Sequence, residues 1–286
     1  THAQVKVSDG AVREIVAAYT RESGVRVLER KLAAICRKAA MKIVDGEKTV
    51  KITEKDLHEN LGAPRYFPER QALEERVGVV NGLAWTSVGG ELLEVEVNVV
   101  PGSGKVELTG NLGDVMKESA HAALSFIRSQ AERLGISQNF YKEKDIHVHF
   151  PEGAVPKDGP SAGIAITTAI VSALTGVPVR RGLAMTGEVT LRGRVLPIGG
   201  LKEKTMAAFR NGIRTVIIPA DNEKDLEEID QTVRGALQFH LVEQADQVLA
   251  IALPALNAGE KENTPKAEPE TMLPPERGSA AARLRQ

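Results

Sequence analysis

Apolar residues recur at helical spacing through the first part of the chain, and polar residues fill the positions between them. Beyond Ser23 the apolar side chains repeat every three or four residues, which is the period of a helix with one buried face. Residues of the type that caps helix N-termini precede three such runs: Ser8, Ser23, and Thr53 with Asp56 three positions later. The pattern therefore predicts a small helical subdomain over residues 1–62.

The period changes from helical to alternating beyond residue 76. Over residues 91–100 the apolar side chains occupy every second position, with Glu94, Glu96 and Asn98 between them, which predicts a strand with one buried face. Further strands are predicted over 77–86, 145–150, 183–186, 189–197 and 214–218, and helices over 114–134, 162–174, 201–210, 222–229 and 244–253. This part of the chain is thus predicted to mix strands and helices.

Two segments lack these periods. Residues 63–76 contain Pro64 and Pro68 among polar residues and are predicted to be a linker. From residue 257 the chain is rich in Pro, Glu, Lys and Ala and has no aromatic residue, so we expect a disordered tail over 257–286. The predicted organisation is a helical subdomain, a linker, a larger domain over 77–256, and this tail.

Composition and charge set limits on the class of protein. The 286 residues are 42% hydrophobic and 26% charged, which is typical of a globular protein. With 37 basic and 38 acidic residues, the total charge gives no sign of a dedicated nucleic-acid or membrane surface.

The single cysteine, Cys36, cannot form an internal disulfide, which fits the cytoplasm, and its apolar-periodic segment predicts a buried side chain. Because the chain begins at Thr1 without a signal-peptide pattern, we expect a piece of a longer protein.

Ser161 is the first candidate for chemistry. It follows Gly159 and Pro160 and stands where a loop enters an almost wholly apolar helix. Free backbone N–H groups at a helix start can stabilise an oxyanion, and nearby glycines let a substrate backbone come close. On local sequence alone, however, a helix-capping serine is the simpler interpretation.

A lysine is the candidate base, because a serine hydroxyl is a weak nucleophile until a base accepts its proton. A lysine amine can do so only when it is neutral, so burial must lower its pKa from the ordinary value of about 10.4. On a helical wheel Lys204 lies between two alanines, whereas Lys202 lies between Met206 and Phe209. The period alone does not choose between the two lysines.

A different catalytic arrangement also fits part of the sequence. Residues 159–163 match the G-x-S-x-G elbow of α/β-hydrolases, and Asp225 and His240 follow in the order of that triad. That elbow requires a strand leading directly into the serine, whereas prolines and a glycine precede Ser161. We therefore place this interpretation below the Ser-Lys one.

Three long motifs resemble the signature of the soluble Lon proteases. They are Pro156–Ala165 (PKDGPSAGIA), Ala184–Gly193 (AMTGEVTLRG) and Val195–Lys204 (VLPIGGLKEK). The resemblance extends from Gly24 to Leu253, with the motifs in the order and spacing of the family. It implies an α+β protease domain of the ribosomal protein S5 domain 2-like type, and a serine endopeptidase that uses a Ser-Lys dyad.

The resemblance also implies roles for individual residues. Ser161 matches the nucleophile, and Lys204, rather than Lys202, matches the general base. Thr186 matches a threonine that helps orient the lysine. The segment Asp158-Gly159-Pro160 matches a loop whose acidic residue can rearrange and occlude the site.

Three further matches lie outside the dyad. Trp85 and Glu96 match positions near the substrate groove, although they suit the core and the surface of a strand equally well. Residues 1–62 resemble the small helical part of the ATPase module that precedes the Lon protease domain. Within it, Arg26 matches an arginine that senses nucleotide phosphate, whereas without the resemblance it reads as a solvated arginine at a helix start.

Nucleotide hydrolysis is not expected from this chain itself. Part of a phosphate-binding loop is matched by Gly102-Ser103-Gly104-Lys105. The full motif also needs a glycine at position 99 and Ser or Thr at position 106, and both positions are valine. We predict a hairpin turn there.

The resemblance implies that the longer protein uses ATP and Mg²⁺, and that this chain retains at most ATP-independent peptidase activity, which needs no cofactor. It also implies a cytoplasmic homohexamer that degrades unfolded, damaged or regulatory proteins; the balanced charge gives no support for DNA binding.

Two other interpretations fit parts of the chain. His147 and His149 alternate on a predicted strand and so share a face, but no third ligand is evident nearby, which favours structural histidines over a metal site. A Lon-like fold can also act as a non-catalytic scaffold. The presence of both Ser161 and Lys204 argues against that alternative.

Overall fold

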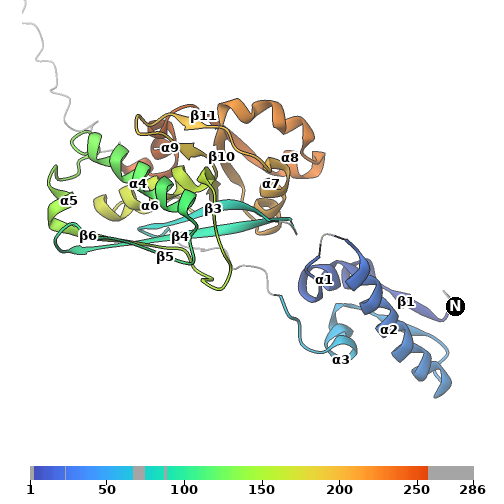
Figure 1. Ribbon diagram of the computed structural model, residues 1–286. Helices are drawn as coiled ribbons and strands as arrows, with labels where there is room; N and C mark the ends of the chain where they lie inside the picture. Colours follow the sequence, from blue (N-terminus) through green and yellow to red (C-terminus); the bar gives the residue numbers. More distant parts are fainter. Residues whose placement is uncertain (1–2, 23, 67–74, 87–88, 257–286) are drawn as a thin grey trace, which may run out of the picture.

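The computed structural model describes residues 3–22, 24–66, 75–86 and 89–256. Figure 1 shows a small helical part, formed by the N-terminal residues, and a larger part built on a central sheet. The predicted mixed α+β class is therefore confirmed. The predicted disordered tail and most of the predicted linker (67–74) lie outside the described residues.

The small subdomain has a hydrophobic core of its own. Its elements are β1 (Val5–Val7), α1 (Asp9–Tyr19), α2 (Arg26–Val44), β2 (Val50–Ile52), the 3₁₀ helix η1 (Glu54–Asp56) and α3 (Leu57–Leu61). The strands β1 and β2 pair in parallel, and the buried side chains of Ile15, Ile35 and Leu57 come from three different helices. This core is separate from those of the larger domain.

Two of the predicted helix caps are confirmed. The Ser8 hydroxyl accepts a hydrogen bond of 3.0 Å from the backbone N–H of Ala11, which starts α1. Thr53 and Asp56 form the predicted capping box before α3. Such caps satisfy backbone N–H groups that have no partner within the helix.

The cap of α2 differs from the prediction. The helix begins at Arg26, and the Glu22 carboxylate accepts hydrogen bonds from the backbone N–H groups of Val27 and Leu28. These bonds, chiefly the one from Val27, lower the pKa of Glu22. Ser23, the predicted cap, lies outside the described residues. A carboxylate at this place satisfies the same N–H groups and also suits the positive end of the helix dipole.

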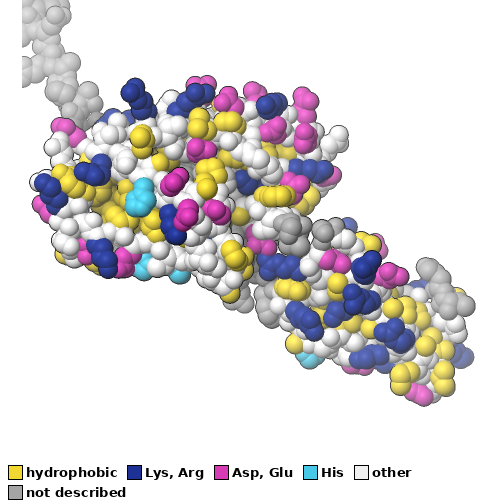
Figure 2. All heavy atoms as spheres, viewed as in Figure 1, with side chains coloured by type: hydrophobic (Ala, Val, Ile, Leu, Met, Phe, Trp, Pro, Cys, Tyr) yellow, Lys and Arg dark blue, Asp and Glu magenta, His cyan; other side chains and the backbone are white. Residues whose placement is uncertain are grey.

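The outer surface of α2 corrects one prediction and adds a feature that total charge conceals. Cys36 is exposed rather than buried, because it follows the buried Ile35 and turns to the solvent side of the helix. Figure 2 shows Lys and Arg side chains gathered over the small subdomain. Six of them belong to α2: Arg26, Arg30, Lys31, Arg37, Lys38 and Lys42.

The larger domain is built on a seven-stranded mixed sheet in the order β11-β10-β7-β3-β4-β6-β5. These strands are β3 (Val79–Thr86), β4 (Gly89–Pro101), β5 (Val106–Thr109), β6 (Lys144–His149), β7 (Leu183–Met185), β10 (Thr215–Pro219) and β11 (Gln238–Val242). A separate antiparallel pair is formed by β8 (Glu188–Val189) and β9 (Val195–Leu196). The predicted strand over 189–197 is thus two short strands joined by a turn.

Helices cover both faces of this sheet. They are α4 (Asp114–Ser129), α5 (Phe140–Glu143), η2 (Pro160–Ala162), α6 (Gly163–Thr175), α7 (Leu201–Arg210), η3 (Ala220–Glu228), α8 (Gln231–Ala236), α9 (Ala245–Ala252) and η4 (Pro254–Leu256). One core contains α4, α6 and α9, and the other contains α7 and α8, so α6 and α7 pack on opposite faces of β3 and β4 (Figure 1). The predicted alternation of β4 is confirmed, since Leu93, Val95 and Val97 are buried in the first core.

The turn after β4 is not the predicted hairpin. Strand β6 lies between β4 and β5, so residues 102–105 carry the chain past a neighbouring strand. The Asp145 carboxylate holds this turn by accepting hydrogen bonds of 2.8 to 3.0 Å from the backbone N–H groups of Ser103, Gly104 and Lys105. Local turn residues could not show that a later strand would insert there.

Helix α4 is shorter than predicted. It ends at Ser129 rather than near residue 134, and its last serine donates a hydrogen bond of 2.7 Å back to the carbonyl of Phe126. Tight turns follow, up to Gly135, whose φ of 67° is a left-handed conformation that favours glycine. Leu134 still packs in the core, which is why its position continues the helical pattern.

Candidate active site

Ser161 lies on the short helix η2, directly before α6. No side-chain cap bond is made at the start of either helix, so the helix-capping interpretation of Ser161 is wrong. Within the described residues the Ser161 hydroxyl has no hydrogen-bond partner. Gly159, with a φ of 111°, makes the bend that leads into η2. The serine side chain is thus left available at the end of a helix.

The backbone of Ser161 is fixed by the segment that follows β7. Its carbonyl accepts a hydrogen bond of 2.8 Å from the N–H of Gly187 and one of 3.3 Å from the hydroxyl of Thr186. The carbonyl of Gly187 in turn accepts a bond of 3.0 Å from the N–H of Ile164. The start of α6 is therefore fastened to the carboxyl end of a central strand.

Lys204 reaches the same point from α7. Its side chain is 3% exposed, and its Nζ donates a hydrogen bond of 3.1 Å to the Thr186 hydroxyl. Burial lowers the pKa of Lys204 from 10.5 to about 8, because removing an ammonium group from water penalises its charged form. Lys202, which the helical wheel left as an alternative, is exposed to solvent.

Thr186 connects the two candidate catalytic residues. Its hydroxyl accepts from the Lys204 amine and donates to the Ser161 carbonyl, so it bridges α7 and η2. Lys204 Nζ and Ser161 Oγ are not hydrogen bonded to each other in the described part of the chain. Hydrogen bonds between catalytic groups are often absent without substrate and form only in its presence.

The alternative Ser-His-Asp triad is not assembled. His240 lies on β11, and its Nε2 atom is buried without a hydrogen-bond partner among the described residues. The Asp225 carboxylate instead accepts a hydrogen bond from the side chain of Asn222. A triad needs the histidine to bond both the carboxylate and the serine, so this interpretation is wrong.

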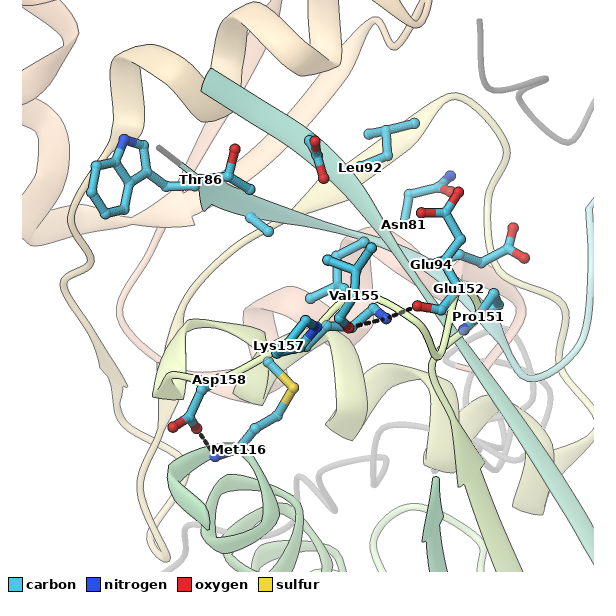
Figure 3. A pocket seen from close by; sticks show the side chains of 15 residues that line it. Asn81, Thr86, Leu92, Glu94, Met116, Pro151, Glu152, Val155, Lys157 and Asp158 are labelled. Carbon is cyan, nitrogen blue, oxygen red and sulfur yellow. Dashed lines mark hydrogen bonds between the residues drawn. The ribbon is translucent and has the colours of Figure 1, made fainter. Parts of the chain in front are cut away.

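Asp158 is bound to the start of α4. Its Oδ1 atom accepts a hydrogen bond of 3.0 Å from the N–H of Met116 (Figure 3). It also accepts one of 2.8 Å from the N–H of Gly159. The approach requires a glycine at 113, because a Cβ atom there would lie 2.2 Å from the carboxylate carbon. In this conformation Asp158 occupies the positive end of the α4 dipole and contacts neither Ser161 nor Lys204 through a hydrogen bond.

Lys157, the neighbour of Asp158, braces the same loop. Its Nζ donates to the backbone carbonyls of Glu152 at 2.8 Å and Val155 at 3.1 Å (Figure 3). It also donates to the carbonyl of Gly110 at 3.4 Å. Burial lowers the pKa of Lys157, although all three donors of its ammonium group are used. Nothing in the sequence pattern singles out this role beyond the place of Lys157 next to Asp158.

A groove of about 300 Å³ is lined by the loop that leads to Ser161, up to Asp158, although neither Ser161 nor Lys204 is among its lining residues. Strands β3 and β4 form one wall, and the loop before Ser161 forms the other (Figure 3). Trp85, which is 61% exposed, lies on its wall together with Thr86 and Val155. The groove therefore combines apolar surface with the backbone of two extended segments.

Glu96 does not line this groove, whereas Glu94 does. Glu96 pairs with Arg76 at 3.8 Å, at the rim of the sheet. Desolvation raises the pKa of Glu94, and a hydrogen bond with Glu96 adds to the rise. The two carboxylates thus interact, with Glu94 on the groove side.

The remaining candidates lie away from the dyad. Arg26 is exposed at the first turn of α2, in the small subdomain. His147 and His149 do share a face, and each ring nitrogen lies within 2.8 Å of the Thr109 hydroxyl. Within the described ranges no three His, Cys, Asp or Glu side chains are grouped so that they could hold a metal ion. No helix in that part of the chain is long and apolar enough to cross a membrane.

Comparison with known proteins identifies the family of this chain. The model of the Lon protease (S16) C-terminal proteolytic domain matches residues 51–255, which include both Ser161 and Lys204. The model of the Lon protease AAA+ ATPase lid domain matches residues 1–52, which fall in the small subdomain. The two matches together account for nearly all of the described chain.

Individual relatives agree with these models. Lon protease 1 of Bacillus subtilis is 58% identical over 251 residues, which are 87% of this chain and 32% of that protein. The Lon protease of Brevibacillus choshinensis is 56% identical over 90% of this chain, and that of Geobacter metallireducens is 50% identical over 98%. The chain spans about a third of the length of these relatives. It belongs to the Lon protease family of serine peptidases.

Proposed function

We propose that this chain cleaves peptide bonds with a Ser-Lys dyad formed by Ser161 and Lys204. The observation that carries the proposal is the buried amine of Lys204, which has the Thr186 hydroxyl as its partner and a pKa lowered to about 8. A lysine in that setting is neutral in a useful fraction of molecules near neutral pH, so it can accept a proton.

The reaction follows from the positions of these groups. Neutral Lys204 accepts the proton of Ser161, and the serine oxygen attacks the peptide carbonyl. The C–N bond then breaks as the Lys204 ammonium group returns this proton to the leaving amine, so an acyl-enzyme ester and a neutral Lys204 remain. Water then hydrolyses the ester, with Lys204 as the base for the second step. Backbone N–H groups at the start of α6 stabilise the oxyanion, because they point out of the positive end of the helix. Thr186 is a positioning residue that holds the amine toward η2.

The groove supplies the binding site in this proposal. An extended peptide lies between β3 and the loop that contains Asp158, Gly159 and Pro160, with Trp85 against one of its side chains. Glu94 faces the peptide, and Glu96 acts on the groove through Glu94. When Asp158 leaves the end of α4, the loop can rearrange around Ser161 and close the site.

The activity of the longer protein is a wider part of the proposal. By its family, that protein is an ATP-dependent cytoplasmic protease, a homohexamer that degrades unfolded, damaged or regulatory proteins. ATP and Mg²⁺ would act there, with Arg26 near the nucleotide phosphates; Arg26 is exposed, as such a contact requires. Peptide hydrolysis by this chain needs neither of them, because the proposed chemistry uses only its own side chains.

Hydrolysis of an unstructured protein such as casein, without ATP, tests the dyad. The chain should cleave it, and Ser161→Ala should abolish cleavage while the melting temperature stays the same. Thr167→Val is a matched control, because this buried hydroxyl lies on α6 and bonds its own helix at the carbonyl of Gly163. Equal cleavage by wild type and Ser161→Ala would overturn the proposal.

A further inference from the structure

Helix α7, which bears Lys204, rests directly on the first residues of β4. A Cβ atom at Gly90 would lie 2.0 Å from the carbonyl oxygen of Glu203 and 2.9 Å from the backbone nitrogen of Lys204. Distances this short leave room only for hydrogen, so residue 90 must be glycine for α7 to sit where it does. Gly90 thus touches the backbone of the proposed general base.

Two more contacts join the same short stretch of strand to α7. Arg210, at the far end of the helix, donates a hydrogen bond of 3.1 Å to the carbonyl of Gly90. Trp85, the partner of Gly90 in the β3–β4 register, packs on Gly200 at the helix start, where a Cβ atom would lie 3.0 Å from the tryptophan side chain. The start and the end of α7 are therefore both held by this part of the sheet.

The next residue of β4 connects to the small subdomain. Glu91 forms an ion pair with Arg21, which follows α1. Glu91 also lines the groove, and its side chain is 23% exposed. Arg21 is further drawn to Glu152 on the opposite groove wall by charge attraction. One cation of the small subdomain thus contacts a carboxylate on one wall of the groove and is attracted by a second on the other wall.

We propose that Gly90, Glu91 and Arg21 are positioning residues for the general base, and that through them the small subdomain sets the placement of α7 and Lys204. The connection has two contacts, Arg21 to Glu91 by charge and Gly90 to the Lys204 backbone by close packing. If Arg21 is displaced, the start of β4 shifts with Glu91. Helix α7 then shifts with β4, because Gly90 is in direct contact with the α7 backbone. This inference rests on the proposed dyad.

The packing contact is tested with Gly90→Ala. The added methyl group should push α7 outward, hydrate Lys204 and raise its pKa toward the ordinary value of about 10.4. The pKa is read by NMR titration of ¹³C-lysine-labelled protein, with the Lys204 signal assigned by its loss in Lys204→Met. Each unit of increase should lower kcat for casein about tenfold at pH 7, with KM changed less. Gly235→Ala is the control, since nothing lies near a Cβ atom there.

The charge contact is tested with Arg21→Glu, Glu91→Arg and the double exchange. Each single change should lower kcat about two- to fivefold, as expected for a partly exposed ion pair, and raise the pKa of Lys204 slightly. The exchanged pair should recover most of the loss in kcat and return the pKa of Lys204 to its wild-type value. A merely structural ion pair would leave the pKa of Lys204 unchanged in all three variants, and a substrate-binding role of Glu91 would not be rescued by the exchange. These variants remain informative if Gly90→Ala fails to fold.

The outcomes separate this inference from the proposed dyad. If Lys204→Met keeps full activity, the dyad is wrong whatever the other variants do. If Lys204→Met is inactive but Gly90→Ala leaves both the Lys204 pKa and kcat unchanged, the positioning role of β4 is wrong. If the double exchange is as impaired as the two single changes combined, the coupling from the small subdomain is wrong.

Discussion

The loop before Ser161 and helix α7 each hold a lysine through hydrogen bonds, but in opposite ways. Lys157 donates to three loop carbonyls, so all the hydrogens of its ammonium group are used. Lys204 donates to a single hydroxyl from inside a helix that is packed on the sheet. Burial lowers the pKa of both.

This contrast shows that a lowered pKa does not by itself make a base. Three carbonyl partners accept hydrogen bonds but offer no proton to a neutral amine, so the ammonium form of Lys157 fits its site best. The Thr186 hydroxyl can donate as well as accept, so Lys204 can lose its proton without leaving a partner unsatisfied. The partners of a lysine therefore decide whether it braces a loop or accepts protons.

The largest expected difference is in turnover. Lys204→Met should lower kcat for casein by about 10³-fold or more, because it removes the proposed acceptor of the serine proton. Lys157→Met should keep most of the chemistry and mainly raise KM, because its loop forms a groove wall. Steady-state kinetics of the two variants check this, and equal kcat values would remove the distinction between the lysines.

Stability should change in opposite directions. Lowering a lysine pKa from 10.5 to about 8 costs about 3 kcal/mol at neutral pH, so Lys204→Met should raise the free energy of unfolding by up to that amount. Lys157→Met should lower it by about 1 kcal/mol, because three carbonyls lose their donor but water can reach at least two of them. Urea denaturation at pH 7 measures both, and stabilisation by Lys157→Met would contradict the bracing role.

The pH dependence of activity sharpens the assignment of the base. The neutral form of a group with a pKa near 8 increases about tenfold between pH 7 and pH 9, so casein cleavage should rise by about that factor. Stability should rise too between pH 8 and 10.5, because over that interval the unfolded chain binds the proton that the folded chain has released. A flat activity profile over pH 7 to 9 would exclude Lys204 as the group that titrates.

The smallest expected effect belongs to the partner of Lys204. Thr186→Val keeps the shape but removes the hydroxyl, so kcat should fall about fivefold, the value of one buried hydrogen bond. Thr168→Val is the matched control, because that buried threonine bonds its own helix at the Ile164 carbonyl. If both variants lower kcat equally, the hydroxyl at position 186 has no special role.

Local patterns predicted the features that depend on neighbours in sequence. The capping box at Thr53, the alternation of β4 and the entry of a loop into α6 are of this kind. The insertion of β6 between β4 and β5 and the strand β11 were missed, because pairing partners are set by tertiary contacts. The residues within each of these strands do not identify the strand with which it pairs.

The same distinction between local patterns and tertiary contacts holds for the candidate site. Ser161 and Lys204 stand in long motifs, and the resemblance chose Lys204 where the helical period could not. The brace from Lys157 to Gly110 and the approach of Gly90 to Glu203 join segments far apart in the chain. A glycine or lysine alone gives no hint of the partner it will meet, so these contacts required the structure.

The bridge at Thr186 also bears on how the enzyme is made. Ser161 and Lys204 belong to helices on opposite faces of the sheet, and they meet at the end of β7, which pairs with β3 and β10. A chain leaving the ribosome carries the serine well before its base, and the two come together only when the central strands have paired. On the proposed mechanism, a copy in which these strands have not paired would have a serine without its base, so activity would arise only with the complete fold.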